Sequence, residues 1–423
     1  MRLEQGSRGS VAPAGGAPSL LQDLDFMKFW VGQSIAVFGA QFSPLAIQVI
    51  AYRLGATPFQ FGILAFLNTV PFLILGLFAG LWLDRHRRRR VLILSDVGRS
   101  LVLFSIPVSA ILYVVTLDML YVVTCAAGVL TVFFEIGYQA YVPSLVEREQ
   151  IVDANSKLET TRSLSQALGP SVAGVVVQYV SPPLAVLGDT LGYTSSWVSL
   201  SLIRKPDEAP KGPRKSALHD IKEGLALVFK DPKLRSIAGC TATSNLFSAA
   251  FGTILTLFFL QNLGMNKDPV LVGVIYGIGS LGGVVGALLA IRVARRLGVG
   301  MAIIVGSVIF SLLSALFYFA TPSNGFVLGA AILFFSYIGV LIYNVTQVSY
   351  RQALVPREIQ GRMNASIRTL VWGIIPVGNI LGGTVAQVIG VKETVVLMAV
   401  LCMISPLWVI FSPVRHVRDF PRA

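Results

Sequence analysis

Apolar residues are grouped along the chain in long blocks that short polar segments separate. Between Phe26 and Pro413 the sequence contains twelve such blocks. Each can cross a bilayer as a helix, because about 20 apolar residues span the hydrocarbon core and lipid offers no partner for an open backbone amide. The pattern therefore predicts an all-α membrane protein with twelve transmembrane helices. The predicted spans are 26–53, 59–83, 91–116, 119–142, 158–180, 183–203, 234–262, 270–294, 300–320, 325–350, 364–389 and 393–412.

Almost all of the positive charge lies in the two tails, in alternate loops between the predicted spans, or at the helix ends beside those loops. Of the 34 Lys and Arg residues, only Arg53, Lys267 and Lys392 lie in or beside the odd-numbered loops. Positively charged loops stay cytoplasmic, so we expect a multi-pass protein of the cell inner (plasma) membrane with both termini in the cytoplasm. The net charge of +13 could also indicate nucleic-acid binding. Its placement is explained by membrane topology instead, and no nucleic-acid partner is expected.

The composition argues against most soluble chemistry. The chain is 54% hydrophobic and 13% charged, with a mean hydropathy of +0.72, whereas soluble domains are about 25% charged. The three cysteines lie inside predicted helices without paired spacing, and the three histidines lie in predicted cytoplasmic segments. We find no convergent nucleophile, metal cluster or nucleotide-binding loop of the kind an enzyme needs. No enzyme activity, metal or cofactor is therefore expected.

The two halves of the chain repeat each other. Asp25 opens the first predicted span and Asp231 the seventh, while Asn155 followed by Gly169 and Gly174 recurs as Asn364 followed by Gly378 and Gly383. Gly62 and Gly273 stand at equivalent places early in the second and eighth spans. Duplicated six-helix units are a known plan of transporters, with the ligand site between the halves near the middle of the bilayer.

The segments outside the spans complete the predicted domain organisation. Residues 1–24 are rich in Gly, Ala, Pro and Ser without the features of a signal peptide, and we expect a disordered cytoplasmic tail. Two six-helix bundles are predicted at 25–203 and 233–413, with a cytoplasmic tail at 414–423. Between them, 204–232 is predicted to be a linker with an amphipathic helix on the inner membrane surface. An extension of the seventh span is the alternative, which Pro232 interrupts.

A loop motif and several flanking segments resemble one known family. Residues 80–89 carry Gly80, Asp84, Arg85, Arg88 and Arg89 and resemble the loop signature Gly-x-x-x-Asp-Arg-x-Gly-Arg-Arg of the major facilitator superfamily. The second Gly is replaced by Arg87, which is similar to the drug:proton antiporter branch that contains macrolide-efflux proteins and the enterobactin exporter. The resemblance implies two six-helix bundles related by pseudo-two-fold symmetry.

Two motifs acquire roles through this resemblance. Gly169-Pro170, with Gly174 after it, resembles the motif that distinguishes antiporters from symporters, which favours export. The resemblance also implies that Gly80, Asp84, Arg85 and Arg88 form a cytoplasmic gate, with Asp84 at the N-terminus of the eleventh span near Asn364. An anion suits a helix N-terminus. A charged turn that only fixes topology is the alternative.

The resemblance implies that the first, fourth, seventh and tenth spans line a central cavity. The sequence supports this, because each of these spans carries polar residues at helical spacing. Polar residues also hold membrane helices together, so packing is the alternative for each single stripe. Aromatic and amide groups without clustered cations suit a bulky amphipathic or cationic solute. The candidate substrate-cavity residues are Gln41, Gln48, Thr131, Asn245, Tyr337, Asn344 and Gln347.

Glu135 is the main candidate for proton coupling. It lies in the fourth span, roughly 12 Å from the cytoplasmic end at 1.5 Å per residue. A buried carboxyl favours its neutral form unless a cation lies nearby, and acids inside the membrane are functional by default. Arg99 and Arg162 lie at similar depth, so a structural ion pair is the alternative.

Two other acids of the first half are expected to be structural. Asp189 is predicted to bond Thr190, Tyr193 or Thr194 nearby, and Asp96 to form a local network with Arg99. The second half has no acid within its predicted spans. Any side-chain proton carrier is therefore expected in the first half.

Together these features predict a monomeric secondary transporter that exports amphipathic small molecules by proton antiport and alternating access. Its expected partners are a small-molecule substrate, protons and the lipid bilayer. A facilitator or importer of the same fold is the first alternative. A non-transporting membrane sensor or an enzyme is the second.

Overall fold

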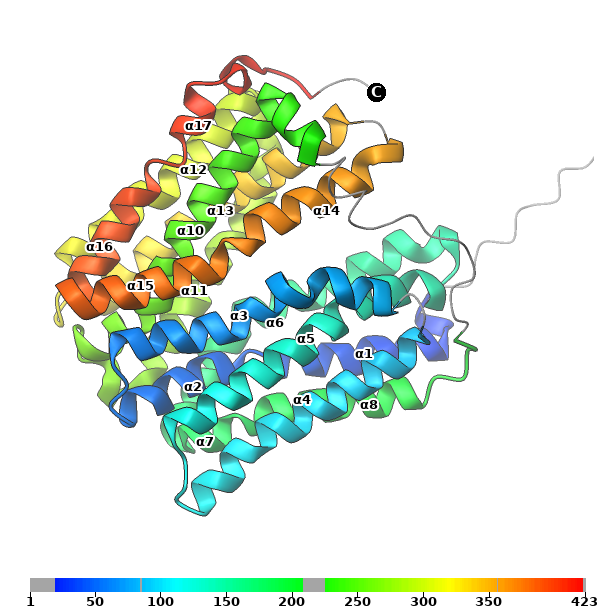
Figure 1. The fold of residues 1–423 in the computed structure, drawn as a ribbon, viewed down its shortest axis with the longest axis vertical. Helices are drawn as coiled ribbons and strands as arrows, with labels where there is room; N and C mark the ends of the chain where they lie inside the picture. Colours follow the sequence, from blue (N-terminus) through cyan, green and yellow to red (C-terminus); the bar gives the residue numbers. More distant parts are fainter. Residues whose placement is uncertain (1–19, 84–85, 208–224, 356, 421–423) are drawn as a thin grey trace, which may run out of the picture.

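The computed structural model describes residues 20–83, 86–207, 225–355 and 357–420, and within these ranges every regular element is a helix. The helices form two bundles that lie side by side, one from each half of the chain (Figure 1). The predicted all-α fold with two helical bundles is confirmed. The predicted amphipathic helix of the linker lies largely outside the described residues, although 225–230 is helical. Of the tail predicted to be disordered at 1–24, residues 1–19 lie outside the described residues, whereas Leu20–Gln22 forms a 3-10 turn and a helix begins at Leu24.

The first bundle, called the N half below, contains the helices before the linker. They are α1 (Leu24–Gly39), α2 (Phe42–Arg53), α3 (Pro58–Leu83), α4 (Arg88–Ile111), α5 (Leu117–Leu145), α6 (Ile151–Tyr179), α7 (Pro182–Ala185) and α8 (Leu187–Ser201). Short 3-10 turns occur at Leu20–Gln22 and Arg148–Gln150.

The second bundle, called the C half, contains the helices after the linker. They are α10 (Pro232–Gln261), α11 (Pro269–Leu297), α12 (Val299–Ala315), α13 (Gly325–Leu354), α14 (Arg357–Gly373), α15 (Ile375–Ile389), α16 (Val391–Cys402) and α17 (Leu407–Ile410). Its 3-10 turns are Met265–Lys267, Leu316–Phe319 and Pro413–His416.

Ten segments of the described chain are long and apolar enough to cross a membrane. The other two predicted spans correspond to α6 and to α7 with α8. The 29-residue helix α6 is long enough, but its first half carries Asp153, Lys157, Glu159 and Arg162. The sixth span is interrupted at Val186 and leaves the 15-residue helix α8. We expect these two spans to be stable in the bilayer only when they pack against neighbouring helices.

The first span is broken, which its continuous apolar sequence did not predict. α1 ends at Gly39 and α2 begins at Phe42. Pro44 favours the break, because its ring clashes with the carbonyl four residues earlier, that of Ala40, and it offers no N–H to a continuous helix. Proline alone is not a sufficient cause, since Pro71 and Pro107 lie inside the unbroken helices α3 and α4. The equivalent helix of the C half, α10, runs unbroken from Pro232 to Gln261.

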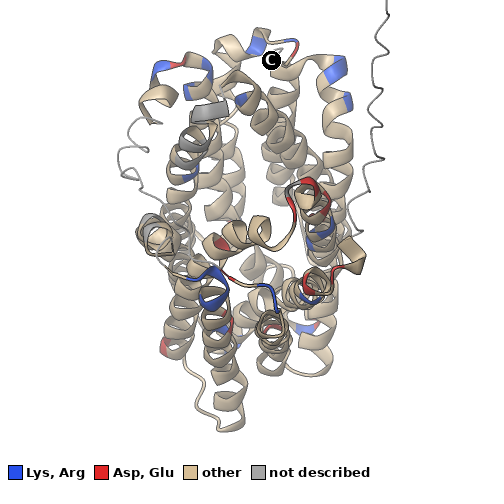
Figure 2. Cartoon of the chain, turned by 90° about the vertical axis from the view of Figure 1, so that its right-hand side faces the viewer, with Lys and Arg blue, Asp and Glu red and all other residues tan. Residues whose placement is uncertain are grey.

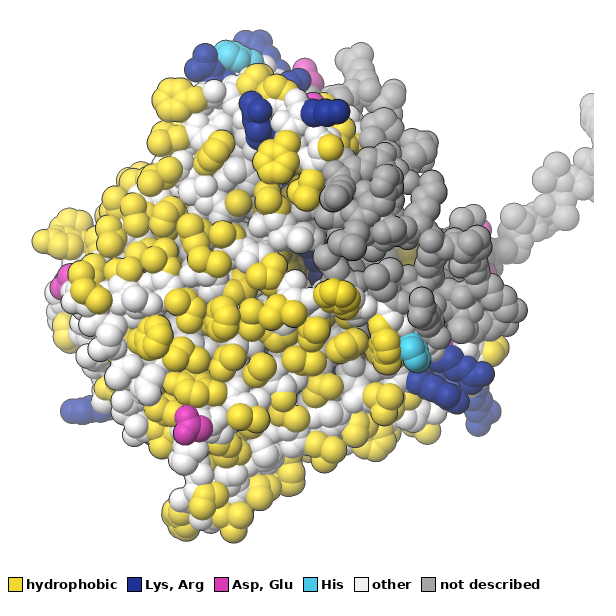
Figure 3. Space-filling model, viewed as in Figure 1, with side chains coloured by type: hydrophobic (Ala, Val, Ile, Leu, Met, Phe, Trp, Pro, Cys, Tyr) yellow, Lys and Arg dark blue, Asp and Glu magenta, His cyan; other side chains and the backbone are white. Residues whose placement is uncertain are grey.

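The two ends of the molecule differ in charge. We call the end that holds Ile203–Asp207 and Leu225–Lys230 the linker end, and the end where α2 and α6 finish the far end. Charged positions gather at helix ends and connections around the linker end (Figure 2). Hydrophobic side chains cover the middle of the face drawn in Figure 3, and Leu101 on α4 and Val388 on α15 are 66% and 78% exposed. Such an apolar belt suits contact with lipid.

The halves meet closely through two seams of glycine. In one seam, a Cβ added to Gly383 on α15 would lie 2.8 Å from the Cα of Gly62 on α3. In the other, a Cβ added to Gly273 on α11 would lie 2.9 Å from the Cα of Gly174 on α6. Backbones approach this closely only where side chains are absent. Both seams lie toward the far end, whereas Gly76 and Gly80, nearer the linker end of α3, have no atom within 4 Å of an added Cβ.

Candidate functional site

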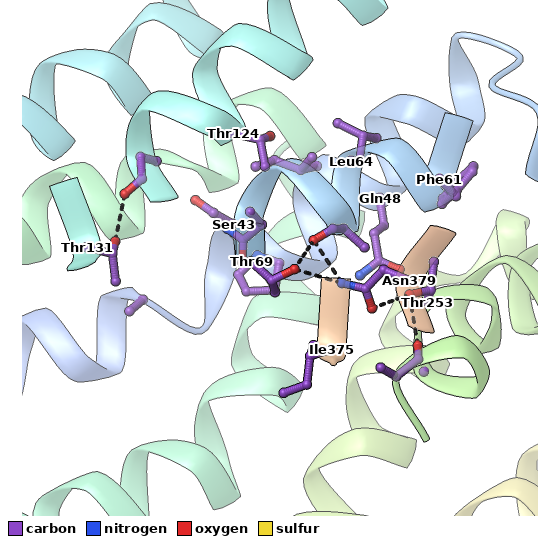
Figure 4. Close-up of a pocket in the computed structure, with 18 of the residues that line it drawn as sticks. Ser43, Gln48, Phe61, Leu64, Thr69, Thr124, Thr131, Thr253, Ile375 and Asn379 are labelled. Carbon is purple, nitrogen blue, oxygen red and sulfur yellow. Dashed lines mark hydrogen bonds between the residues drawn. The ribbon is translucent and has the colours of Figure 1, made fainter. Parts of the chain in front are cut away.

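A cavity of about 610 Å³ lies between the two halves. We call it the central cavity, and Figure 4 shows part of its lining. Gln48, Thr131 and Asn245, predicted from sequence to face a cavity, line it. Further lining residues are Ser43, Phe61, Thr69, Arg99, Asp189, Ser248, Thr253, Ile375 and Asn379. Both halves therefore contribute polar and apolar groups to one chamber.

Two smaller cavities adjoin the central one. The N-half cavity, about 550 Å³, shares Ala40, Arg99, Thr131 and Tyr193 with it. The C-half cavity, about 310 Å³, shares Asn245, Ser248 and Gly252 with it. Each half thus holds its own recess beside the central chamber.

Four candidate cavity residues lie outside the lining of the central cavity. Gln41 lines the N-half cavity, and Tyr337 and Asn344 line the C-half cavity. Gln41 and Gln48 line different cavities, because the break at Ala40–Gln41 interrupts the single helical face on which their seven-residue spacing would place them. Gln347 is 3% exposed and lines none of these three cavities, and its Oε1 has no hydrogen-bond partner in the described structure.

Arg99 stands between the central and the N-half cavities. Its guanidinium forms an ion pair with Asp96, one turn earlier on α4, and lies between the rings of Phe134 and Tyr193, 4.0 and 4.1 Å from their centroids. Stacking on aromatic faces suits the planar guanidinium. The ion pair leaves little of the Arg99 charge available for Glu135.

The Asp96–Arg99 pair belongs to a buried polar network. The Ser196 hydroxyl on α8 donates to the second carboxylate oxygen of Asp96. Gln33 on α1 donates to Ser196 through Nε2 at 2.6 Å. Asp96 and Ser196 have no exposed surface, and Gln33 is 3% exposed. This is the local network expected for Asp96, and it extends over three helices.

Glu135 lines the N-half cavity together with Arg162, Glu159 and Gln166. Within the described part of the chain, no hydrogen bond or ion pair joins its carboxylate to another group. The structural ion pair considered as an alternative is therefore not formed in this conformation. Arg162 faces the same cavity and keeps positive charge in that space.

Asp189 has a partner that the sequence did not indicate. It is 3% exposed and lines the central cavity. Its Oδ1 accepts a hydrogen bond from the backbone N–H of Ser43, at the start of α2, over 2.9 Å. The expected partners Thr190 and Thr194 instead donate to backbone carbonyls of α7–α8, those of Val186 and Thr190. This contact depends on the break in the first span, so no local sequence pattern could have revealed it.

Asn379 on α15 connects the two halves at the central cavity and was not singled out from the sequence. Its Nδ2 donates to the carbonyl of Ala65 at 3.0 Å and to the hydroxyl of Thr69 at 2.9 Å, both on α3. Its Oδ1 accepts from Thr253 on α10 at 3.0 Å (Figure 4). One amide therefore joins three helices. The available signal was weak, because α15 also carries Thr384 and the second amide Gln387.

The Gly169-Pro170 motif on α6 lies at two helix contacts. A Cβ added to Gly169 would overlap the side chain of Gln41, and one added to Gly273 would overlap the carbonyl oxygen of Pro170. Gly174, one turn further on, forms the seam with Gly273. The motif therefore joins α6 to the first span on one side and to the C half on the other.

The candidate gate is only partly described. Asp84 and Arg85 lie outside the described residues, as does the side chain of Asn364. Arg88 donates through Nη1 to the carbonyl of Ala140 on α5 at 2.7 Å, so it joins the start of α4 to α5 within the N half. Gly80 faces open space. Nearby, Arg368 on α14 donates to Gln139 on α5 at 3.4 Å.

Comparisons with known proteins agree with this architecture. A model of the Major Facilitator Superfamily matches residues 29–377. The chain is 24% identical over 362 residues to "Multidrug efflux pump Tap" of Mycolicibacterium fortuitum, covering 83% of this chain and 86% of that protein. It is 20% identical over 381 residues to "Macrolide efflux protein A" of Streptococcus pyogenes, covering 89% and 93%.

Solved structures show the same fold. A mutant of the nucleoside transporter NupG has a TM-score of 0.71 at 14% identity, covering 92% of this chain and 99% of that one. A bacterial homologue of the iron transporter ferroportin, in an inward-facing state, has a TM-score of 0.69 at 15% identity, covering 91% and 98%. Because the family model spans most of the chain, the protein belongs to the major facilitator superfamily and is a membrane transporter, not an enzyme.

Proposed function

We propose that this transporter exports amphipathic small molecules, such as drugs, siderophores or secondary metabolites, in exchange for protons. The central cavity carries the proposal, because both halves line it and their relative movement would expose it to one side of the membrane at a time. The relatives whose names state drug or macrolide efflux support the direction of transport.

The lining of the central cavity favours an amphipathic solute. Phe61, Leu64 and Ile375 offer apolar surface, while hydroxyls and amides such as Thr131 and Asn245 offer hydrogen bonds. A mostly apolar pocket with a few placed polar groups is typical of small-molecule sites. Gln41, Tyr337, Asn344 and Gln347 would contribute only in other conformations or through the adjoining cavities.

The direction of opening follows from the proposed topology. We propose that the protein lies in the plasma membrane with its linker end in the cytoplasm, and the distribution of Lys and Arg supports this orientation. The glycine seams lie toward the far end, which would then face outward. The conformation described here suits the loading of a solute from the cytoplasm, the first step of export.

Glu135 remains the proposed proton carrier, with Arg162 and Arg99 as the nearby cations. Its carboxylate faces the N-half cavity without a bonded partner, so it is free to exchange a proton with water there. Arg162 would favour release of the proton when it approaches more closely. The gate residues Gly80, Asp84, Arg85 and Arg88, and the motif at Gly169, Pro170 and Gly174, would couple this exchange to movement of the halves. A single chain contains both halves, and we propose that it acts as a monomer.

Everted membrane vesicles test this proposal. We expect proton-driven accumulation of a fluorescent amphipathic probe by the wild type, and loss of that accumulation in Glu135→Gln. The exposed residue Glu149 supplies the control, since Glu149→Gln should accumulate the probe normally. Accumulation that survives both a collapsed pH gradient and Glu135→Gln would exclude proton antiport through Glu135, and movement of the probe down its own gradient would indicate a facilitator or importer.

A growth-inhibition panel tests the gate separately. Cells that produce the wild type should tolerate more of a toxic amphipathic compound than cells without it. Asp84→Asn at equal expression should abolish this protection, whereas Asp118→Asn, at an exposed site of the far end, should preserve it. Equal protection by both variants would exclude Asp84 from the gate.

A further inference from the structure

We propose that Asp189 is a second proton-binding residue. Its negative charge fixes the start of α2 at the break in the first span, and its protonation leaves the start of α2 free to move. This inference rests on the proposed proton-coupled transport and assigns a separate conformational role to a residue outside the Glu135 site. It starts from the contact between the Asp189 carboxylate and the N–H of Ser43 across 2.9 Å.

The start of α2 lacks a local cap. Gln41 occupies the N-cap position, but its side chain makes no capping hydrogen bond and instead donates to the carbonyl of Val37. The first N–H groups of a helix need acceptors, and an anion there is favoured by the helix dipole. Asp189 supplies that acceptor from α8. The break next to Pro44 therefore has a charged partner elsewhere in the N half.

Glycines hold the two segments at the distance this contact requires. A Cβ added to Gly188 would lie 2.8 Å from the ring of Phe42, and one added to Gly192 would lie 3.1 Å from the Cα of Ala36. A Cβ added to Gly39 would overlap the carbonyl oxygen of Gly188. The backbone of α8 thus packs directly against the break, with Asp189 next to Gly188 in sequence.

The charges around Asp189 do not balance. Among the described residues that line the central cavity, only Asp189 and Arg99 carry formal charge, and Arg99 is already paired with Asp96. Tyr193 on α8 is the other titratable group of that lining, and the lining residues from α2, α3, α5, α10 and α15 are uncharged. Glu135 and Arg162 face the N-half cavity, beyond Arg99. Two acids therefore share one cation, and a buried carboxylate without a counter-charge is costly.

A proton entering from the central cavity would remove that imbalance. Two helix N-termini favour the charged form, because Asp189 also lies in the first turn of its own helix α8. Burial favours the neutral form. When Asp189 takes a proton, its hydrogen bond to Ser43 loses the charge that strengthens it. The start of α2 is then free to move relative to α1, which changes the wall of the central cavity.

Hydrogen–deuterium exchange of the full-length protein in lipid nanodiscs tests the switch. After correction for the intrinsic pH dependence of exchange, we expect residues 40–48 of the wild type to exchange about fivefold faster in mildly acidic than in mildly alkaline buffer, since a charged acceptor roughly doubles hydrogen-bond strength. Asp189→Asn keeps an acceptor oxygen without the charge and should remove this pH dependence. Asp189→Glu should retain it, and Asp118→Asn should behave as the wild type.

Infrared difference spectra provide an independent readout of protonation. Acidification should produce a carboxylic-acid carbonyl band that is absent from Asp189→Asn and present in Glu135→Gln and Asp118→Asn. An unchanged band in Asp189→Asn, or pH-dependent exchange that persists in that variant, would overturn the inference. Either result would leave the vesicle experiment on export intact. Conversely, a vesicle experiment without proton-driven export would refute the proposed function while the titration of Asp189 could still be observed.

Discussion

Gly174 of the N half and Gly273 of the C half face each other so closely that a Cβ on Gly273 would lie 2.9 Å from the Cα of Gly174. The same contact recurs between Gly383 and Gly62, which are the equivalents of Gly174 and Gly273 in the sequence repeat. The two seams are thus related by the internal duplication. Their closeness comes from backbone contact and not from interlocking side chains.

A methyl group in a seam should destabilise this conformation. We expect Gly273→Ala to lower the free energy of unfolding by about 1–3 kcal/mol, the usual cost of overpacking. Gly76→Ala is the matched control, because an added Cβ there meets no atom within 4 Å and Ala favours a helix over Gly by up to about 1 kcal/mol. Thermal unfolding in detergent measures both. A higher unfolding temperature for Gly273→Ala than for the wild type would contradict the seam.

Removal of the Asn379 amide should weaken the junction of three helices. Asn379→Leu leaves the Thr253 and Thr69 hydroxyls without this partner, and we expect a loss of about 1–3 kcal/mol in unfolding free energy. Asn68 lines the same cavity but is exposed. Asn68→Leu should therefore change stability by less than about 0.5 kcal/mol. Denaturant unfolding compares the two, and equal losses would exclude a special role for Asn379.

Breaking the buried ion pair on α4 should cost more than breaking an exposed one. Arg99→Met leaves Asp96 buried without its cation, and we expect destabilisation of about 3–5 kcal/mol. Adding Asp96→Asn to this variant should recover most of the loss. In Lys157→Met, which removes an exposed pair with Asp153, the loss should stay below about 1 kcal/mol. A double variant as unstable as Arg99→Met would show that the uncompensated charge is not the cause.

Filling the junction of two cavities should weaken solute binding. Ser248 lines both the central and the C-half cavities, so Ser248→Trp would occupy space that both share. We expect the dissociation constant of a transported probe to rise at least about tenfold, equivalent to 1.4 kcal/mol. Ser201→Trp, at an exposed position at the end of α8, controls for the added indole. Fluorescence titration of purified protein gives both constants, and unchanged binding in Ser248→Trp would place the solute elsewhere.

Hydropathy, charge placement and the internal repeat were enough to predict the bundles, because spans such as 270–294 and 325–350 can be recognised as membrane helices from their length and apolarity alone. The sequence repeat also predicted that Gly62 and Gly273 are equivalent, although it did not indicate that each glycine contacts the other half. The break at Ala40–Gln41 could have been suspected from Pro44.

The site was less predictable because cavity walls depend on helix rotation and on contacts between distant segments. Helical spacing placed Gln41 and Gln48 on one face, and the break separated them. Asp189 was paired in prediction with its sequence neighbours, whereas its partner Ser43 lies 146 residues away. The role of Asn379 could not be predicted, because it depends on contacts between α3, α10 and α15 that only the folded structure brings together.

The polar first half of α6 has a consequence for how the protein reaches its membrane. A segment that carries Asp153, Lys157, Glu159 and Arg162 gains little by leaving the translocation channel alone, since a charged residue opposes insertion by about 2.5–3.5 kcal/mol at a helix centre and by less toward its ends. During synthesis, we therefore expect α6 to enter the lipid only when it packs against α5 or later helices, which keep its charged side chains away from the hydrocarbon core. Biogenesis of the N half would then proceed in cooperative groups of helices, and not one span at a time.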